Sequence, residues 1–106
     1  MQALPLQVMR EDHESTATLA LVGEIDLASA HLLVDSIDEA IDDGVKTIVL
    51  DFAGVTFVNS TGLGAMVAAT KRLRADGGDL VLRQFRGIPA SALATTGLDR
   101  FFTIES

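Results

Sequence analysis

The chain has 106 residues, of which 48% are hydrophobic and 22% charged, a length and balance typical of a single globular domain. It lacks cysteine, which excludes thiol catalysis, thiolate metal sites and disulfides and indicates a reducing compartment. Fifteen acidic and eight basic side chains give a formal charge of -7, so we expect no binding to nucleic acid or to anionic membrane surfaces. The sequence shows no bilayer-spanning apolar stretch and no secretory signal, so we expect a cytoplasmic protein without membrane insertion.

The first part of the chain predicts a β-hairpin followed by a helix. Apolar residues alternate over residues 4–8, and a β-branched and apolar run over 16–22 predicts the partner strand. The charged residues 11–15 between these strands predict a turn. Over residues 28–42 the apolar side chains recur at helical spacing and carboxylates occupy the opposite face, which predicts an amphipathic helix.

Strands and helices alternate in the rest of the chain. The patterns predict a strand over 45–52, a loop over 53–59, a helix over 61–75, a strand over 79–83, a short helix over about 89–97 and a last strand over 101–104. A strand–helix alternation that follows an antiparallel hairpin is typical of an α/β fold with a mixed β-sheet. We therefore predict one small α/β domain over residues 1–106.

The usual catalytic and metal-binding patterns are weak in this sequence. Only two histidines occur, His13 in the charged turn and His31 at the start of the first predicted helix, and neither lies near a nucleophile motif. The acidic residues around His13 resemble a cation site, but such a run is usually a solvated turn. The sequence has neither a phosphate-binding Gly-Lys loop nor a Gly-x-Ser-x-Gly elbow. We therefore predict no catalytic residue, no metal site and no cofactor.

The segment at 57–64, Phe-Val-Asn-Ser-Thr-Gly-Leu-Gly, joins a predicted loop to a predicted helix. Ser60 stands where an N-cap belongs, so the simplest interpretation is that its hydroxyl caps the helix. Each of the two glycines costs a helix about 0.5 to 1 kcal/mol relative to Ala, and stability alone gives no reason for that cost. Bare backbone would let another molecule approach closely. The unpaired N–H groups at this end of the helix would also favour a phosphate on Ser60.

Several segments of the chain resemble the STAS family, specifically the small bacterial anti-anti-sigma factors. The Gly-Glu-Ile-Asp sequence at 23–26 is similar to the family's Gly-Glu-Leu-Asp, and residues 51–58 resemble its central strand and following loop. The Ser-Thr-Gly-Leu-Gly sequence at 60–64 resembles the family's Asp-Ser-Ser/Thr-Gly-Leu-Gly, and residues 77–82 and 96–102 also resemble family sequence. The resemblance implies a mixed sheet with helices packed mainly on one face.

The resemblance implies a regulatory function without enzyme activity. In such a function the unphosphorylated protein binds a serine-kinase anti-sigma factor and frees the sigma factor. Phosphorylation of one serine by that kinase switches the protein off, and a PP2C-type phosphatase would remove the phosphate. Ser60 aligns with that serine. The residues that the resemblance places in partner binding are Glu24, Asp26, Asn59, Thr61, Gly62, Leu63 and Gly64.

Asn59 departs from the family pattern, because the family commonly has Asp at this position. The change removes a charge next to the phospho-acceptor and leaves an alternative open: a non-phosphorylated STAS docking subunit of a membrane transport or lipid-trafficking assembly. Thr61 matches a hydroxyl residue at the helix start rather than the main acceptor. A third function, a small hydrolase with Ser60 as nucleophile, would need a histidine that the spacing does not supply.

Overall fold

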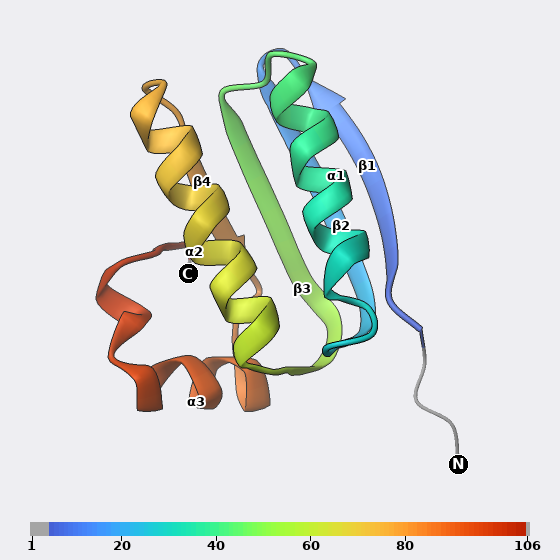
Figure 1. Ribbon diagram of the computed structural model, residues 1–106, viewed down its shortest axis with the longest axis vertical. Helices are drawn as coiled ribbons and strands as arrows, with labels where there is room; N and C mark the ends of the chain where they lie inside the picture. Colours follow the sequence, from blue (N-terminus) through green and yellow to red (C-terminus); the bar gives the residue numbers. More distant parts are fainter. Residues whose placement is uncertain (1–4, 106) are drawn as a thin grey trace.

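The computed structural model describes residues 5–105, which form one five-stranded sheet with three α-helices (Figure 1). In chain order the elements are β1 (Gln7–His13), β2 (Thr16–Ile25), α1 (Ala30–Asp42), β3 (Thr47–Val58), α2 (Ser60–Ala75), β4 (Asp79–Arg83), α3 (Gly87–Thr96), the 3-10 turn η1 (Leu98–Arg100) and β5 (Thr103–Glu105). The strand order is β1-β2-β3-β4-β5. Only β1 and β2 pair antiparallel, so the sheet is mixed, as predicted.

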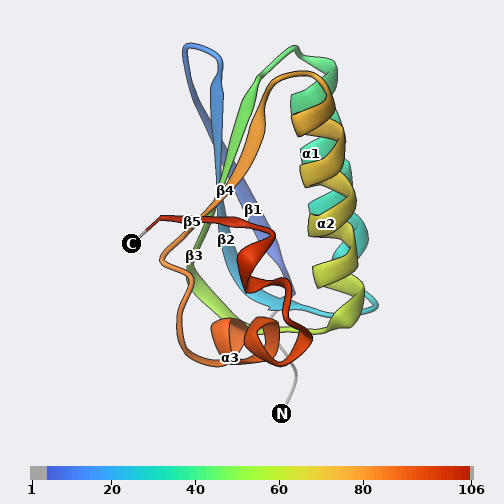
Figure 2. The same ribbon diagram turned by 90° about the vertical axis from the view of Figure 1, so that its left-hand side faces the viewer.

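Two long helices, α1 and α2, lie side by side on one face of the sheet, and α3 lies at one end of it (Figures 1 and 2). The strand order advances in a single direction, and right-handed crossovers that advance in this way place their helices on the same face. The core forms between this face and the helices, and Ile48 and Leu50 of β3 lie at its centre with no exposed surface. The predicted α/β fold with helices mainly on one face is confirmed.

The second half of β3 corrects the prediction of a loop over 53–59. The strand runs to Val58, and only Asn59 separates it from α2. Shifts in the register between β2 and β3 carry the pairing past Gly54, where a Cβ atom would lie only 2.9 Å from the carbonyl oxygen of Leu21. The small and polar residues after Phe52 continue the strand because Gly54 lets the backbone of β2 approach closely. This approach depends on the neighbouring strand, so the local sequence pattern does not reveal it.

The ends of several other elements also differ from the predictions. The first strand is Gln7–His13 rather than 4–8, so most of the predicted turn is strand, and the hairpin turn contracts to Glu14 and Ser15. The edge strand is charged here because its side chains are largely exposed and need no apolar alternation. Residue 4 of the predicted strand lies outside the described residues.

The remaining differences come from local turns. Strand β2 extends beyond residue 22 to Ile25, and α1 begins at Ala30 rather than at residue 28. The last strand starts at Thr103 instead of residue 101, because the backbone N–H of Phe101 donates to the carbonyl oxygen of Leu98 and closes the preceding turn. The predicted strand over 79–83 is confirmed.

Candidate functional site

Segments 23–26 and 57–64 lie together at one end of the sheet, where the central strands β2 and β3 finish. Parallel strands β2 and β3 end side by side there, with Glu24 opposite Phe57 and Ile25 opposite Val58. The backbone N–H of Asn59 donates to the carbonyl oxygen of Ile25 at 3.0 Å. This hydrogen bond ties the start of α2 to the end of β2, so residues far apart in the sequence form one surface.

The start of α2 is capped by Asn59, and the prediction that Ser60 is the N-cap is wrong. Asn59 has the extended backbone that an N-cap requires, and its side-chain oxygen Oδ1 accepts a hydrogen bond from the N–H of Gly62 at 3.1 Å. The reason for the difference is the length of β3, which keeps the backbone extended up to Asn59. Ser60 is already the first helical residue, and its side chain is exposed, as is that of Thr61.

The two glycines of the first turns differ in their surroundings. A Cβ atom on Gly62 would lie 2.6 Å from Cγ2 of Ile25 and 2.8 Å from Cγ2 of Val58, so Gly62 is required for close packing of α2 on the sheet. A Cβ atom on Gly64 would meet nothing within 4 Å, and Gly64 is exposed. Leu63 is only 4% exposed and belongs to the hydrophobic core, so its side chain packs α2 against the sheet. Of these three residues, only Gly64 offers open surface.

Asp26 organises the turn between β2 and α1. Its Oδ1 atom accepts hydrogen bonds from the N–H groups of Ala28 and Ser29, each at 3.0 Å. Ser29 is 8% exposed, and its hydroxyl donates to the carbonyl oxygen of Glu24 at 2.8 Å. Ser29 was not predicted as a site residue; an Asp followed three residues later by Ser at the start of a helical pattern is the signal that indicates such a turn. Asp26 and Glu24 are both half-buried.

Exposed apolar side chains accompany the two carboxylates at this edge. Leu27, in the turn after Asp26, is 77% exposed, and Phe57 is 39% exposed. Helix α3, which carries the exposed Ile88, lies at the same end of the sheet as the start of α2 (Figures 1 and 2). A contiguous exposed apolar patch is typical of a surface that binds another protein, whereas single exposed apolar side chains such as these are common on any protein surface.

The two histidines of the chain lie away from Ser60, one in β1 and one in α1. Both histidines are exposed, and within residues 5–105 no histidine side chain forms a hydrogen bond with Ser60. In the same part of the chain no group of three His, Asp or Glu side chains is arranged to hold a metal ion. No α-helix among the described residues is both long and apolar enough to cross a membrane. Among the described residues, the Ser60 hydroxyl is therefore exposed and hydrogen-bonded to neither histidine.

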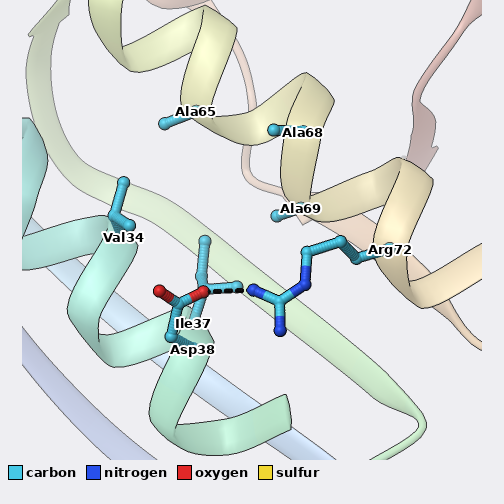
Figure 3. Close-up of a pocket in the computed structure, with 7 residues that line it drawn as sticks. All are labelled: Val34, Ile37, Asp38, Ala65, Ala68, Ala69 and Arg72. Atoms are coloured by element: carbon cyan, nitrogen blue, oxygen red, sulfur yellow. Dashed lines mark hydrogen bonds and ion pairs between the residues drawn. The ribbon is translucent and has the colours of Figure 1, made fainter.

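A groove of about 230 Å³ runs between α1 and α2, further along α2 than Ser60 (Figure 3). Small and branched apolar side chains line it, and the ion pair between Arg72 and Asp38 bridges the two helices. The lining residues are Val34, Ile37, Asp38, Ala65, Ala68, Ala69 and Arg72. The groove reaches Ala65, which follows Gly64, but it does not include Ser60.

Comparisons with known proteins agree with this architecture. The family model for the STAS domain matches residues 7–106. RsfB of Mycobacterium tuberculosis, named an anti-sigma-F factor antagonist, is 36% identical over 62 residues, which cover 58% of this chain and 51% of RsfB. The chain thus matches about half the length of its curated relatives.

Solved structures show the same fold. An anti-sigma factor antagonist from Mycobacterium paratuberculosis superposes with a TM-score of 0.84 at 25% identity, covering 93% of this chain and 84% of that one. The phosphorylated form of the Bacillus cell fate determinant SpoIIAA superposes with a TM-score of 0.72 at 22% identity, covering 95% and 91% of the two chains. At that identity the second likeness concerns the fold alone.

Proposed function

Because the chain belongs to the STAS domain family, we propose that it is an anti-sigma factor antagonist, a protein that binds an anti-sigma factor and so frees the sigma factor. The observation that carries the proposal is the position of Ser60. It is exposed at the first residue of α2, and Gly64, four residues later on the same side of the helix, is exposed as well. The names of the relatives in Mycobacterium support the same function.

The partner in this proposal is a serine-kinase anti-sigma factor that both binds this surface and phosphorylates Ser60. The protein is then a substrate and an antagonist without catalytic activity of its own, and a PP2C-type phosphatase restores its binding form. Glu24, Asp26, Asn59, Thr61 and Gly64 lie on or beside the proposed contact surface. Gly62 and Leu63 are both buried, so in this proposal they pack α2 against the sheet and do not contact the partner directly.

Phosphorylation would change the charge of this surface at one point. A phosphoserine carries about -1.5 to -2 charge units near neutral pH, and it would add them at the exposed first residue of α2. A partner surface that packs around Ser60 and Gly64 would have to desolvate that charge, which is unfavourable. The N–H groups in the first turn of α2 favour the phosphate within the protein itself. Phosphorylation is therefore expected to weaken the complex while the domain stays folded.

The test is a transfer and binding experiment with the serine-kinase anti-sigma factors of the source organism, each purified and incubated with the protein and ATP. Mass spectrometry should find one phosphate on the native protein and on Thr61→Ala, and none on Ser60→Ala. Calorimetry should show that the phosphorylated product binds the kinase at least about tenfold more weakly, about 1.4 kcal/mol. A phosphate on Thr61, or transfer to Ser60 with unchanged affinity, would contradict the proposed switch.

A non-phosphorylated docking subunit of a membrane transport or lipid-trafficking assembly is the second candidate function. The observation that favours it is the uncharged Asn59 beside Ser60, together with the exposed Leu27 and Phe57, which would suit a permanent contact. In such an assembly, Ser60→Ala and Ser60→Asp would bind the partner equally well. In a phosphorylation switch, Ser60→Asp should bind more weakly than Ser60→Ala, because its carboxylate supplies part of the phosphate charge.

A further inference from the structure

Helices α1 and α2 carry charges of opposite sign. The Asp, Glu, Lys and Arg residues of α1 are all acidic, and those of α2 are all basic. The acidic residues are Asp35, Asp38, Glu39 and Asp42, and the basic residues are Lys71, Arg72 and Arg74. The ion pair between Arg72 and Asp38 crosses the groove and joins the two helices (Figure 3). Among residues 5–105, Asp35 and Lys71 form no ion pair, so their charges remain open to another molecule.

Each helix presents one outward stripe of side chains with the spacing i, i+4, i+7 and i+11, which keeps the residues on one face of the helix. The α1 stripe consists of His31, Asp35, Asp38 and Asp42, and the α2 stripe consists of Gly64, Ala68, Lys71 and Ala75. All of these residues are exposed or half-buried. Apart from Lys71, the α2 stripe contains only Gly and Ala, so another helix can approach it closely.

The two stripes lie at the same level along the helix axes. Helices α1 and α2 run in the same direction, because each connects neighbouring parallel strands of the sheet (Figure 1). The Arg72–Asp38 ion pair places residues 72 and 38 next to each other across the groove. Lys71 of the α2 stripe therefore corresponds in position to Asp38 of the α1 stripe.

Two copies of the chain can bring these helices face to face about a two-fold axis in two ways. An axis that runs across the helices places α1 of one copy on α1 of the other, so carboxylates meet carboxylates. An axis that runs along the helices places α1 of each copy on α2 of the other at the same level. Lys71 of one copy then meets Asp35 and Asp38 of the second copy, and the same contact occurs twice. Only this second arrangement is electrostatically complementary.

We propose that the outer face of α1 and α2 binds a second copy of this chain, with the α2 stripe of each copy on the α1 stripe of the other. The dimer covers the apolar groove between the two helices, which a single copy leaves open. Gly64 belongs to the α2 stripe, so a second copy and a kinase bound at Gly64 would exclude each other. That consequence alone rests on the proposed function.

The size of this face sets the expected affinity. Helices of 13 and 16 residues that lie side by side form a face of roughly 20 Å by 20 Å, from a rise of 1.5 Å per residue and a helix diameter of about 10 Å. This area is about half of the roughly 800 Å² that each partner contributes to a standard interface, so we expect a weak dimer with a Kd of about 0.1 mM. The net charge of -7 opposes association. The measurement therefore uses about 0.15 M salt, which screens the repulsion between whole molecules more strongly than contacts across the interface.

The experiment is sedimentation equilibrium of the full chain alone, from about 10 µM to about 1 mM. The native protein should show a monomer–dimer equilibrium. Lys71→Glu and Asp35→Lys should each raise the Kd at least about tenfold, because each puts like charges at both symmetric contacts. Circular dichroism confirms that the variants are folded. A native protein that stays monomeric at about 1 mM would overturn the proposal and leave the groove to a different protein.

Mixing the two variants tests the arrangement itself. In a mixed dimer the new carboxylate at residue 71 of one copy faces the new ammonium group at residue 35 of the other, and the symmetric contact joins the native Lys71 and Asp35. The mixture should therefore associate about as strongly as the native protein, although neither variant does so alone. A mixture as weak as the separate variants would overturn the proposal.

Arg100→Glu is the matched control for the net charge. It makes the same charge change as Lys71→Glu, but Arg100 lies in η1, outside both helices. This variant should form the dimer with the native Kd. If it weakens the dimer as much as Lys71→Glu, the effect belongs to the net charge of the chain and the proposal fails. None of these measurements includes a kinase, so their outcome is independent of the proposed function.

Discussion

Gly62 in the first turn of α2 packs directly against Ile25 at the end of β2: a Cβ atom on the glycine would lie 2.6 Å from Cγ2 of the isoleucine. Both Ile25 and Val58, the second neighbour, are buried and β-branched, so neither methyl group can easily turn aside. This contact fixes the distance between the start of α2 and the sheet. Because Ser60 is the first residue of α2, the contact also fixes the position of Ser60 relative to the sheet.

The contact predicts opposite effects for two substitutions on one helix. Gly62→Ala should lower the free energy of unfolding by about 1 kcal/mol or more, because the clash outweighs the better helix propensity of Ala. Gly64→Ala is the matched control, since its methyl group meets nothing within 4 Å, and it should raise the free energy of unfolding by about 0.5 to 1 kcal/mol. Urea unfolding measures both. Equal effects of the two substitutions would contradict the packing of α2 described above.

The exposed Gly64 also allows the proposed contact surface to be tested without disturbing the fold. Gly64→Arg places a long charged side chain where the structure leaves open space, so the domain should remain folded. Its affinity for the cognate serine-kinase anti-sigma factor should fall by at least about tenfold, about 1.4 kcal/mol. Calorimetric titration measures the affinity, and circular dichroism confirms the fold. Full affinity in a folded Gly64→Arg protein would place the contact elsewhere.

Much of the fold could be predicted from the sequence, because its elements carry strong local patterns. The spacing of apolar residues along the sequence predicts the strand over 79–83 and the apolar faces of the two long helices. The choice between Asn59 and Ser60 as N-cap could not be made in the same way, because both residue types cap helices well. It depends on how far β3 runs beside β2, and that pairing joins residues about thirty positions apart in the chain.

The role of Asp26 shows a similar limit for the candidate site. A resemblance can place the residue in a motif, but whether its carboxylate faces a partner or its own backbone depends on the turn that follows. In the structure the carboxylate accepts hydrogen bonds from the backbone N–H groups of Ala28 and Ser29, both at 3.0 Å. Asp26 therefore stabilises its own turn, a role that the motif alone does not indicate.

A second cluster of hydrogen bonds, around Asp79 at the start of β4, predicts how stability depends on pH. Partial burial raises the pKa of Asp79, but hydrogen bonds from the Thr103 hydroxyl, Arg74 and the N–H of Leu80 outweigh it and hold the pKa below its usual value. A carboxylate whose pKa is lower in the folded state stabilises the protein above its unfolded pKa, and this contribution is lost as the pH falls through the folded pKa.

The expected result is a loss of stability below about pH 4 that depends on Asp79. Asp79→Asn should unfold at a lower urea concentration than the native protein near neutral pH. Its stability should fall less steeply as the pH is lowered, because the titrating group is gone. Unfolding midpoints measured from about pH 6 to about pH 3 test this. Parallel pH profiles for the two proteins would show that Asp79 contributes nothing to acid unfolding.

The two tasks of Asp26 can be separated by two substitutions. Asp26→Ala removes the acceptor for Ala28 and Ser29 and should lower the free energy of unfolding by about 1 to 2 kcal/mol. Asp26→Asn retains a side-chain oxygen that can accept the same hydrogen bonds but removes the charge, so it should cost about 0.5 kcal/mol or less. Stability is measured by urea unfolding and affinity for the serine-kinase anti-sigma factor by calorimetry. If the carboxylate contacts the partner directly, Asp26→Asn should weaken binding at nearly native stability; native affinity in this variant would leave Asp26 with its structural task alone.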